Sequence, residues 1–295
     1  MTTVDSTAAT APAVPRRPPT PRRRAPSTGD VVRGTLLTAG ALIALAPLVW
    51  AAVSSLKTPS ELAQRPPTFF PSTLTAANYT EAVGGFNFLT YFANSVIVTV
   101  AATLLTLVIN SMAAFALAKY DFRGRDTLFL ITLSTIMIPL QVILLPVYQV
   151  VASLGMANSY LGLIIPPAAT PTGVFLLRQY MLTIPDELIE SARVDGAGEF
   201  RIFWRVVLPL CKPALAVVAI FSVIWRWNDF LWPLLIAQDQ SMYTLPVALA
   251  QFSSQLVVPF NLVLAMSVLS IVPVIIIFLL MQRQVITGIA RTGLK

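Results

Sequence analysis

The chain has 295 residues, of which 56% are hydrophobic and only 11% are charged, and its net charge is +7. Soluble domains are typically about 25% charged, so this composition excludes an ordinary soluble domain and indicates a membrane protein. The absence of histidine and the presence of one cysteine, Cys211, argue against most zinc sites, histidine-based triads and an internal disulfide framework.

The N-terminal segment, residues 1–30, is rich in Pro, Ala, Thr and Arg. Such a composition cannot bury a core, so we expect a disordered cytoplasmic tail. The apolar run that follows, Gly34–Leu56, is too long for the hydrophobic part of a signal peptide and has no clear small-residue cleavage site. We therefore expect this run to remain in the mature protein as the first transmembrane helix of a domain that covers residues 31–295.

Apolar runs long enough to cross a bilayer recur along the rest of the chain. They predict an all-α integral membrane protein with six transmembrane spans, at about 34–56, 94–118, 127–151, 161–177, 213–236 and 257–281. The segment between the first two spans is polar and proline-rich, with a short helix expected after Thr75. The prolines in span four are tolerated only where neighbouring groups satisfy the carbonyls that they free, so span four should lie inside a helix bundle.

The basic residues are distributed asymmetrically between the two sides of the predicted spans. Of the 20 Lys and Arg residues, only Lys57 and Arg65 fall on the second side and only Arg226 lies within a span. Because cytoplasmic segments carry the excess of positive charge, we expect both termini in the cytoplasm of a cell whose inner or plasma membrane holds the chain.

The longest polar stretch between apolar runs is residues 178–212, and we call its residues 182–212 the coupling loop. Pro185 suits the first position of a helix, and Asp186 and Glu187 fall in the first turn, where the helix dipole favours anions. Asp195-Gly196 is a turn signal in which glycine suits a left-handed conformation. The pattern predicts a short helix and a tight turn, then a second short helix from about Glu199 towards Leu208-Pro209.

A short cytoplasmic helix tied at both ends to membrane spans could insert into a groove of a soluble partner and transmit its motion. The alternative is a helix that lies on the membrane surface, which Phe200, Phe203 and Trp204 would favour for the second helix. The first helix carries four acidic residues against one basic residue, so anionic lipid would repel it. This charge favours a protein partner.

The order of residues in the coupling loop resembles the EAA loop of permeases in ATP-binding-cassette importers. The residues that carry the resemblance are Glu190, Ser191, Ala192, Gly196, Val206, Leu208 and Pro209, with serine in place of the usual alanine and valine in place of isoleucine. Further segments from Lys57 onward, among them "AAFALAKYDFRGRD", "WNDFLWPL" and "GIARTGLK", resemble the carbohydrate branch that includes the second maltose permease subunit.

This resemblance implies a permease that alternates between inward-open and outward-open states and translocates a sugar or a related solute. The implied partners are a dimer of ATPase subunits, a second permease subunit and an extracytoplasmic solute-binding protein, which the loop from Gln238 to Gln255 could approach. The implied ATPase-docking residues are Pro185, Asp186, Glu187, Glu190, Ser191, Ala192, Asp195, Gly196, Ala197, Gly198, Leu208 and Pro209. The chain has no GxxxxGK[ST] motif, so any ATP is bound by another chain; we expect no cofactor, no metal, no nucleic-acid partner and no catalysis by this chain.

Polar residues within the predicted spans are candidates for the translocation path, because such groups are costly in hydrocarbon. They are Asn110, Gln141, Arg226, Asn228 and Asp229. Arg226 and Asp229 are three residues apart, so they could share a helix face and pair, or both could reach the membrane interface. Hydrogen bonds between helices are the alternative for Asn110 and Gln141, and an interfacial aromatic belt is the alternative around Asn228.

Two other classes of protein are compatible with an apolar chain. An ion-coupled secondary transporter usually carries carboxylates at mid-membrane, whereas only Asp229 lies in a predicted span and off its centre. A membrane enzyme needs a nucleophile, a base or a metal cluster, for which this sequence lacks histidine and has few acids in its spans. Retention of an ATPase during purification would distinguish the importer from both.

Overall fold

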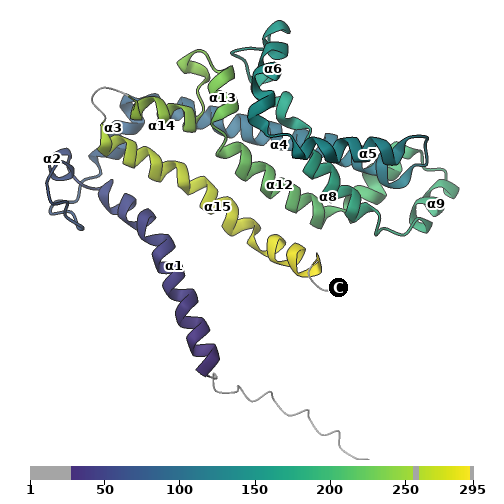
Figure 1. The fold of residues 1–295 in the computed structure, drawn as a ribbon, viewed down its shortest axis with the longest axis horizontal. Coiled ribbons are helices and arrows are strands. Elements are labelled where there is room, and N and C mark those ends of the chain that lie inside the picture. The colour runs from purple at the N-terminus through teal and green to yellow at the C-terminus, as the bar shows by residue number, and fades with distance from the viewer. Residues whose placement is uncertain (1–27, 255–258, 293–295) are drawn as a thin grey trace, which may run out of the picture. The chain divides into compact units, whose positions relative to one another are not determined.

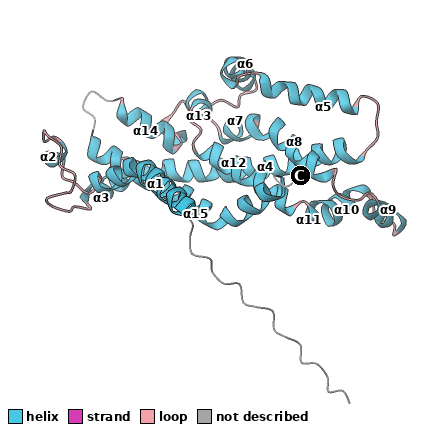
Figure 2. Cartoon of the chain, turned by 60° about the horizontal axis from the view of Figure 1, so that its bottom comes forward, coloured by secondary structure: helices cyan, strands magenta, loops and turns pink. Residues whose placement is uncertain are grey.

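The computed structural model describes residues 28–254 and 259–292, and these residues form helices joined by turns and loops, with no strand among them (Figure 2). The predicted tail falls almost wholly outside the described residues. The chain divides between Leu48 and Val49 into two units. Helix α1, Thr28–Ser54, contains Pro47. Its side chains from Val31 to Trp50 are exposed, as expected of an apolar helix whose surroundings are lipid or another protein.

The second unit is arranged around α4, Phe88–Lys119, the longest helix within it whose side chains are described throughout. α4 packs against α8, Pro171–Met181, and against α12, Lys212–Trp227, which in turn packs against α15, Phe260–Thr292. In Figure 1, α9 lies at one end of this unit, and α3 and α14 lie at the other. The remaining helices of this unit are α2 (Pro59–Leu62), α3 (Ala77–Gly85), α5 (Arg125–Ser134), α6 (Leu140–Ser153), α7 (Tyr160–Ile164), α9 (Glu187–Val194), α10 (Glu199–Ile202), α11 (Leu208–Leu210), α13 (Leu231–Ile236) and α14 (Leu245–Ser253).

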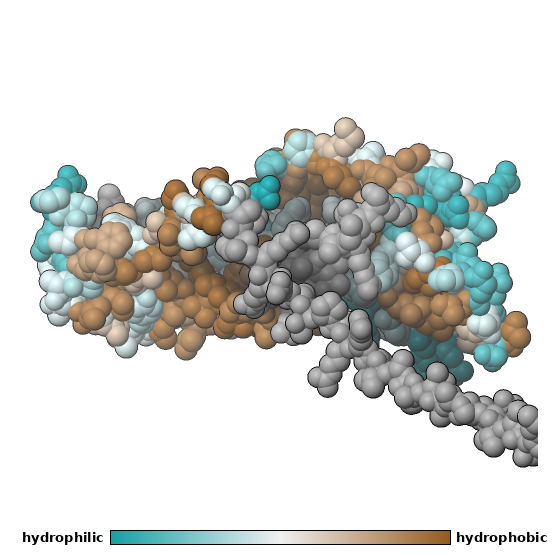
Figure 3. Space-filling model, turned by 90° about the horizontal axis from the view of Figure 1, so that it is seen from below, coloured by the Kyte–Doolittle hydropathy of each residue, from teal (hydrophilic) through white to brown (hydrophobic). Residues whose placement is uncertain are grey.

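Three helices in the described ranges are long and apolar enough to cross a membrane, and they are Val31–Ser54, Phe88–Lys119 and Phe260–Leu280. Three bent pairs have the length and composition of a span only when both members are joined. The bend is 107° between Arg125–Met137 and Leu140–Ser153, 46° between Tyr160–Ala168 and Pro171–Met181, and 80° between Glu199–Leu210 and Lys212–Trp227. Much of the visible described surface is hydrophobic (Figure 3).

Prolines explain two of these bends. Pro139 precedes α6 and interrupts the apolar run that the sequence suggests is one continuous third span. Pro166, Pro167 and Pro171 divide the predicted fourth span into α7, a short 3₁₀ turn at Pro166–Ala168, and α8, which agrees with the irregularity expected there. A proline cannot donate to the carbonyl four residues earlier, so the helix must end or bend.

Candidate functional site: the coupling loop and the polar residues of the spans

The coupling loop folds as a compact element with the predicted helix and turn. α9 covers Glu187–Val194, and Asp186 and Glu187 lie at its beginning, as the charge pattern predicts. Gly196 adopts a φ of +77°, and no atom beyond its own neighbours in the chain lies within 4 Å of where its Cβ would be. Glycine is therefore required there by backbone conformation rather than by lack of space. The second helical segment begins at Glu199 and continues through a π-helical turn, Phe203–Val207, to α11.

A hydrophobic cluster anchors the coupling loop to the ends of α4 and α8. Ile189 of α9 and Ile202 of α10 are buried beside Phe115 of α4 and Leu177 and Met181 of α8. The opposite face of α9 is exposed, including Glu187, Glu190 and Ser191. Val194 is 89% exposed, which is unusual for an apolar residue in a well-packed helix. α9 is thus held by packing on its Ile189 side, and its exposed side carries acidic residues and the apolar Val194.

Lys119, the last residue of α4, holds the beginning of the coupling loop. Its side chain is 4% exposed, and its ammonium donates to the Ile184 carbonyl at 2.6 Å and to Asp186 Oδ1 at 2.6 Å. The role of Lys119 cannot be predicted from the sequence, because its partners lie more than sixty residues away. The only available signal was its position at the end of a predicted span.

A second polar network joins the two short helices of the loop to the residue after α4. Arg193 donates to both carboxylate oxygens of Glu199, at 2.7 and 3.2 Å, and the Tyr120 hydroxyl donates to Glu199 Oε2 at 2.6 Å. Burial, followed by the bond to Glu199, raises the pKa of Tyr120 to about 12, so the phenol keeps its proton at neutral pH. The Arg193–Glu199 contact thus joins α9 to α10 across the turn at Gly196.

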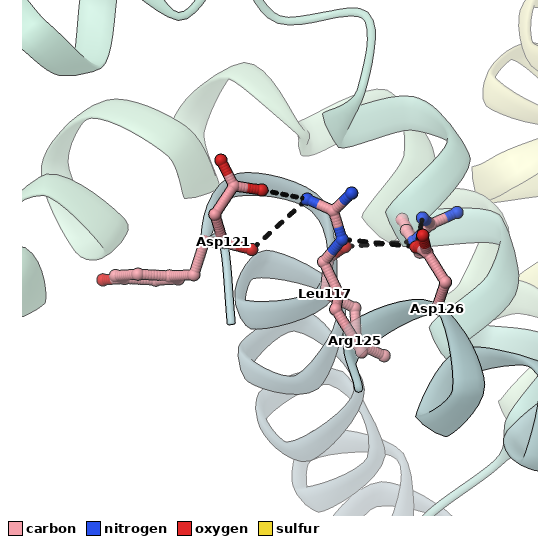
Figure 4. A network of polar contacts seen from close by, with 6 residues as sticks. Leu117, Asp121, Arg125 and Asp126 are labelled. Carbon is pink, nitrogen blue, oxygen red and sulfur yellow. Dashed lines mark hydrogen bonds and ion pairs between the residues drawn. The ribbon is translucent and has the colours of Figure 1, made fainter. Parts of the chain in front are cut away.

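The turn between α4 and α5 is held by a further ion-pair network. Figure 4 shows Arg125 between Asp121 and Asp126, with distances of 2.7 and 3.3 Å to their carboxylate oxygens. Arg178 of α8 donates to the Leu117 carbonyl at 3.1 Å and lies 3.8 Å from Asp126. These contacts tie the beginning of α5 to the ends of α4 and α8, the two helices against which the coupling loop packs.

The polar residues of the spans separate into two groups. Asn110 is fully buried, donates to Thr170 Oγ1 at 2.6 Å and accepts from the Thr170 backbone N–H at 3.1 Å. Arg226 donates to Thr106 Oγ1 at 3.2 Å and to the Pro167 carbonyl. Gln141, near the start of α6, and Asn228 are exposed in the single chain. Internal hydrogen bonds thus account for Asn110 and for one terminal nitrogen of Arg226, whose Nε is buried without a hydrogen-bond partner, whereas Gln141 and Asn228 are exposed.

Of the two arrangements that the sequence leaves open for Arg226 and Asp229, the structure does not show the shared helix face. α12 ends at Trp227, so Asp229 lies in the break before α13 instead of one turn further along the same helix. Its carboxylate accepts from the Trp232 backbone N–H at 3.4 Å, a contact typical of the start of a helix. The tryptophans nearby differ in exposure: Trp227 and Trp232 are buried, whereas Trp225 is 73% exposed.

The other end of the second unit carries two loops stabilised by side-chain hydrogen bonds. Between α1 and α3, buried Glu61 accepts from the Ser72 backbone N–H at 2.8 Å and from the Thr68 hydroxyl at 3.1 Å. Those bonds hold the pKa of Glu61 below its ordinary value. Asn158, before α7, accepts from the backbone N–H groups of Gln238 and Asp239 at 3.0 and 3.1 Å, which fixes the loop after α13.

The all-helical fold with helices able to cross a membrane is consistent with a transport permease, and comparison with known proteins identifies its family. Residues 107–290 match the family described as binding-protein-dependent transport system inner membrane component, and the chain belongs to that family. It is 40% identical over 270 residues to the arabinooligosaccharides transport system permease protein AraQ of Halalkalibacterium halodurans, which covers 88% of this chain and 96% of that protein. It is 33% identical over 271 residues to the sn-glycerol-3-phosphate transport system permease protein UgpE of Agrobacterium fabrum, covering 89% and 96%.

Solved structures agree with this assignment. A chain of a bacterial ABC transporter involved in the import of the acidic polysaccharide alginate matches with a TM-score of 0.79 and 28% identity, over 87% of this chain and 98% of that chain. A chain from the alginate ABC transporter in complex with an alginate pentasaccharide-bound periplasmic protein shares the fold, with a TM-score of 0.60 and 15% identity, over 85% and 94%. The chain is thus a multi-pass membrane permease of an ABC importer and not an enzyme. The ion-coupled alternative gains no support from these relatives.

Proposed function

We propose that this chain is one of two permease subunits in an importer of a sugar or sugar-derived solute, and that its coupling loop docks into a cleft of a separate ATPase subunit. The chain contributes six spans in residues 31–295, with the bent pairs crossing the membrane as irregular spans. Both termini and the coupling loop lie in the cytoplasm, and a solute-binding protein delivers the solute from the other side.

The observation that carries this proposal is the two-sided character of α9. One side is fixed by Ile189 and by the Lys119–Asp186 contact, so the helix keeps its place when an external force acts on it. The other side exposes Glu187, Glu190 and the apolar Val194. A rigid helix with an unpaired recognition face can transmit motion from a soluble partner to the spans behind it.

The class of solute follows from the relatives and from the polar span residues. The relatives named above are permeases for arabinooligosaccharides, sn-glycerol-3-phosphate and alginate, which are all polyhydroxylated molecules. Of the five candidate path residues, the exposed Gln141 and Asn228 are the best placed to meet hydroxyl groups. Asn110, Arg226 and Asp229 shape the path by holding the surrounding helices.

The docking role is tested by isolating the chain in mild detergent together with its co-expressed ATPase. The variant Glu190→Arg with Gly196→Arg reverses charge on the exposed face of α9 and strains the turn at its end. Glu81→Arg is the matched control, because Glu81 is an exposed acid on α3 at the opposite end of the unit. The quantity measured is the amount of ATPase recovered per folded chain.

We expect the native chain and Glu81→Arg to retain the ATPase and the double variant to lose it. Equal retention by all three folded proteins would show that the ATPase docks elsewhere. Failure of the folded native chain to retain a co-expressed ATPase would contradict the proposed complex itself.

A further inference from the structure

The prolines of span four leave backbone carbonyls without their helical donors. In a regular helix the carbonyl of each residue accepts from the N–H four residues later, and proline has none. Pro166 therefore leaves the carbonyl of Gly162 without its helical donor. The carbonyl of Pro167 also lacks one, because the 3₁₀ turn ends at Ala168 and α8 begins only at Pro171. A free carbonyl inside a membrane protein is costly unless another group donates to it.

Both carbonyls receive donors from a single stretch of span five. The Trp232 indole Nε1 donates to the Gly162 carbonyl at 3.0 Å, in a buried contact. The Arg226 guanidinium donates to the Pro167 carbonyl. These two donors lie on either side of the break between α12 and α13. Span five thus supplies the hydrogen-bond donors that the free carbonyls of span four lack.

The close approach of α7 to α13 points to the same connection. A Cβ on Gly162 would lie 3.2 Å from Ile236 Cγ2 of α13, which is a tight contact, while its distance of 2.2 Å from the Met156 carbonyl oxygen is what excludes a side chain there. Trp232 and Ile236 of α13 are buried in one hydrophobic cluster with Leu163 of α7. Packing and hydrogen bonding thus join α7 to α13 at Gly162 and Leu163 on one side and at Trp232 and Ile236 on the other.

We propose that Trp232 and Arg226 are positioning residues that fasten the proline break of span four to the break in span five, so that α7 and α13 move as one body during transport. This inference rests on the proposed function, in which the coupling loop is moved by the ATPase. α8 runs from the break in span four directly into that loop, so the motion reaches the break through α8. Motion of the loop then turns both broken spans together, and the outer loops joined by Asn158 and Asp239 follow.

The movement is measured with two spin labels, one at Leu161 on α7 and one at Leu234 on α13, which are 59% and 38% exposed. The labels are placed in a Cys211→Ala background, because Cys211 is the one native cysteine. The labelled complex in lipid nanodiscs is compared without nucleotide and with ATP trapped. Trp232→Phe removes the indole donor and keeps a ring; Trp225→Phe is the matched control, because Trp225 is exposed.

We expect a narrow distance distribution in the native chain that stays unchanged when ATP is trapped, and a broader one in Trp232→Phe. Trp225→Phe should match the native chain. A native distance that changes with ATP would overturn the proposal, as would equal widths in the two tryptophan variants. The comparison of widths needs no partner, so it can fail or succeed independently of ATPase docking.

Transport provides a readout that a loss of folding alone would not change. In proteoliposomes, the solute moved per ATP hydrolysed, measured on folded complexes, should fall about threefold to tenfold in Trp232→Phe, the range expected for one net hydrogen bond. It should fall further in Arg226→Leu, because that variant loses a bond from a charged donor. Arg226→Lys should recover part of that ratio because it restores a donor. A ratio equal to native in both variants would contradict a positioning role, even if the yield of folded protein fell.

Discussion

The ammonium of Lys119 lies 2.6 Å from Asp186 Oδ1 and joins the last residue of α4 to the beginning of the coupling helix α9. The lysine is buried and the aspartate is 73% exposed. The two side chains therefore differ in their access to water. The Asp186 carboxylate can be hydrated instead, whereas the Lys119 ammonium also donates to the Ile184 carbonyl and is shielded from water.

This difference predicts that substitution of Lys119 lowers the free energy of unfolding more than substitution of Asp186 does. Lys119→Met should destabilise the loop by about 1.5–3 kcal/mol, the range for hydrogen bonds to a charged group, because a buried carbonyl loses its donor. Asp186→Asn should cost only about 0.2–1 kcal/mol, as for exposed ion pairs. Thermal unfolding of the purified variants, with proteolysis of the loop, measures the difference; an equal cost would contradict the assigned role of Lys119.

The turn after α9 predicts a contrast between two neighbouring glycines. Gly196→Ala should destabilise by about 1 kcal/mol, because alanine disfavours a positive φ. Gly198→Ala should be close to neutral, since Gly198 has a φ of −70° and open space around it. ATPase retention and unfolding temperature of the two variants test this. A loss in Gly198→Ala as large as that in Gly196→Ala would show that side-chain size, not backbone conformation, limits this turn.

The loop between α1 and α3 should depend on pH through Glu61. The pKa of Glu61 is lowered in the folded chain, mainly by the Ser72 backbone N–H, from an ordinary value of 4.5. A lowered carboxyl pKa contributes stability that is present above the unfolded pKa and is lost as pH falls through the folded value. Hydrogen exchange of residues 57–78 should thus stay slow near neutral pH and accelerate below about pH 4.5.

Glu61→Gln provides the control for this effect, since glutamine keeps an acceptor oxygen but has no titrating proton. Its exchange should no longer change over the acidic range in which the native loop opens. A native loop whose protection is constant down to the pH of global unfolding would contradict the assignment to Glu61.

The double hydrogen bond between Asn110 and Thr170 predicts a structural role for this residue of span two. Asn110→Ala should lower stability by about 0.6–1.7 kcal/mol, as measured for hydrogen bonds between membrane helices, and leave the preference among solutes unchanged. Gly173→Ala should disturb the same contact from the other side, because its Cβ would lie 2.2 Å from Asn110 Nδ2. Competition transport assays on both variants test this, and a changed solute preference in Asn110→Ala alone would place the residue on the path.

Sequence reasoning reached the helical class, the short helix at Glu187–Val194 and the left-handed turn at Gly196, because each depends on local signals such as apolar runs, charge at a helix end and an Asp-Gly pair. It could not find the partners of Lys119 or Trp232. Those contacts join residues far apart in the chain, and nothing near either residue indicates which carbonyl it will meet. The end of α12 at Trp227 was also missed, since Asn228 and Asp229 interrupt a run whose hydropathy continues to Ile236.

α4 has a consequence for how the importer changes shape. Its 32 residues span about 48 Å without a proline, and Lys119 holds the coupling loop at one end. Near its other end Asn94 donates to the carbonyls of Ser241 and Tyr243 in the loop after α13. The surfaces at the two ends are thus joined by one helix of fixed length, so a displacement of the coupling loop is carried along α4 to the loop after α13.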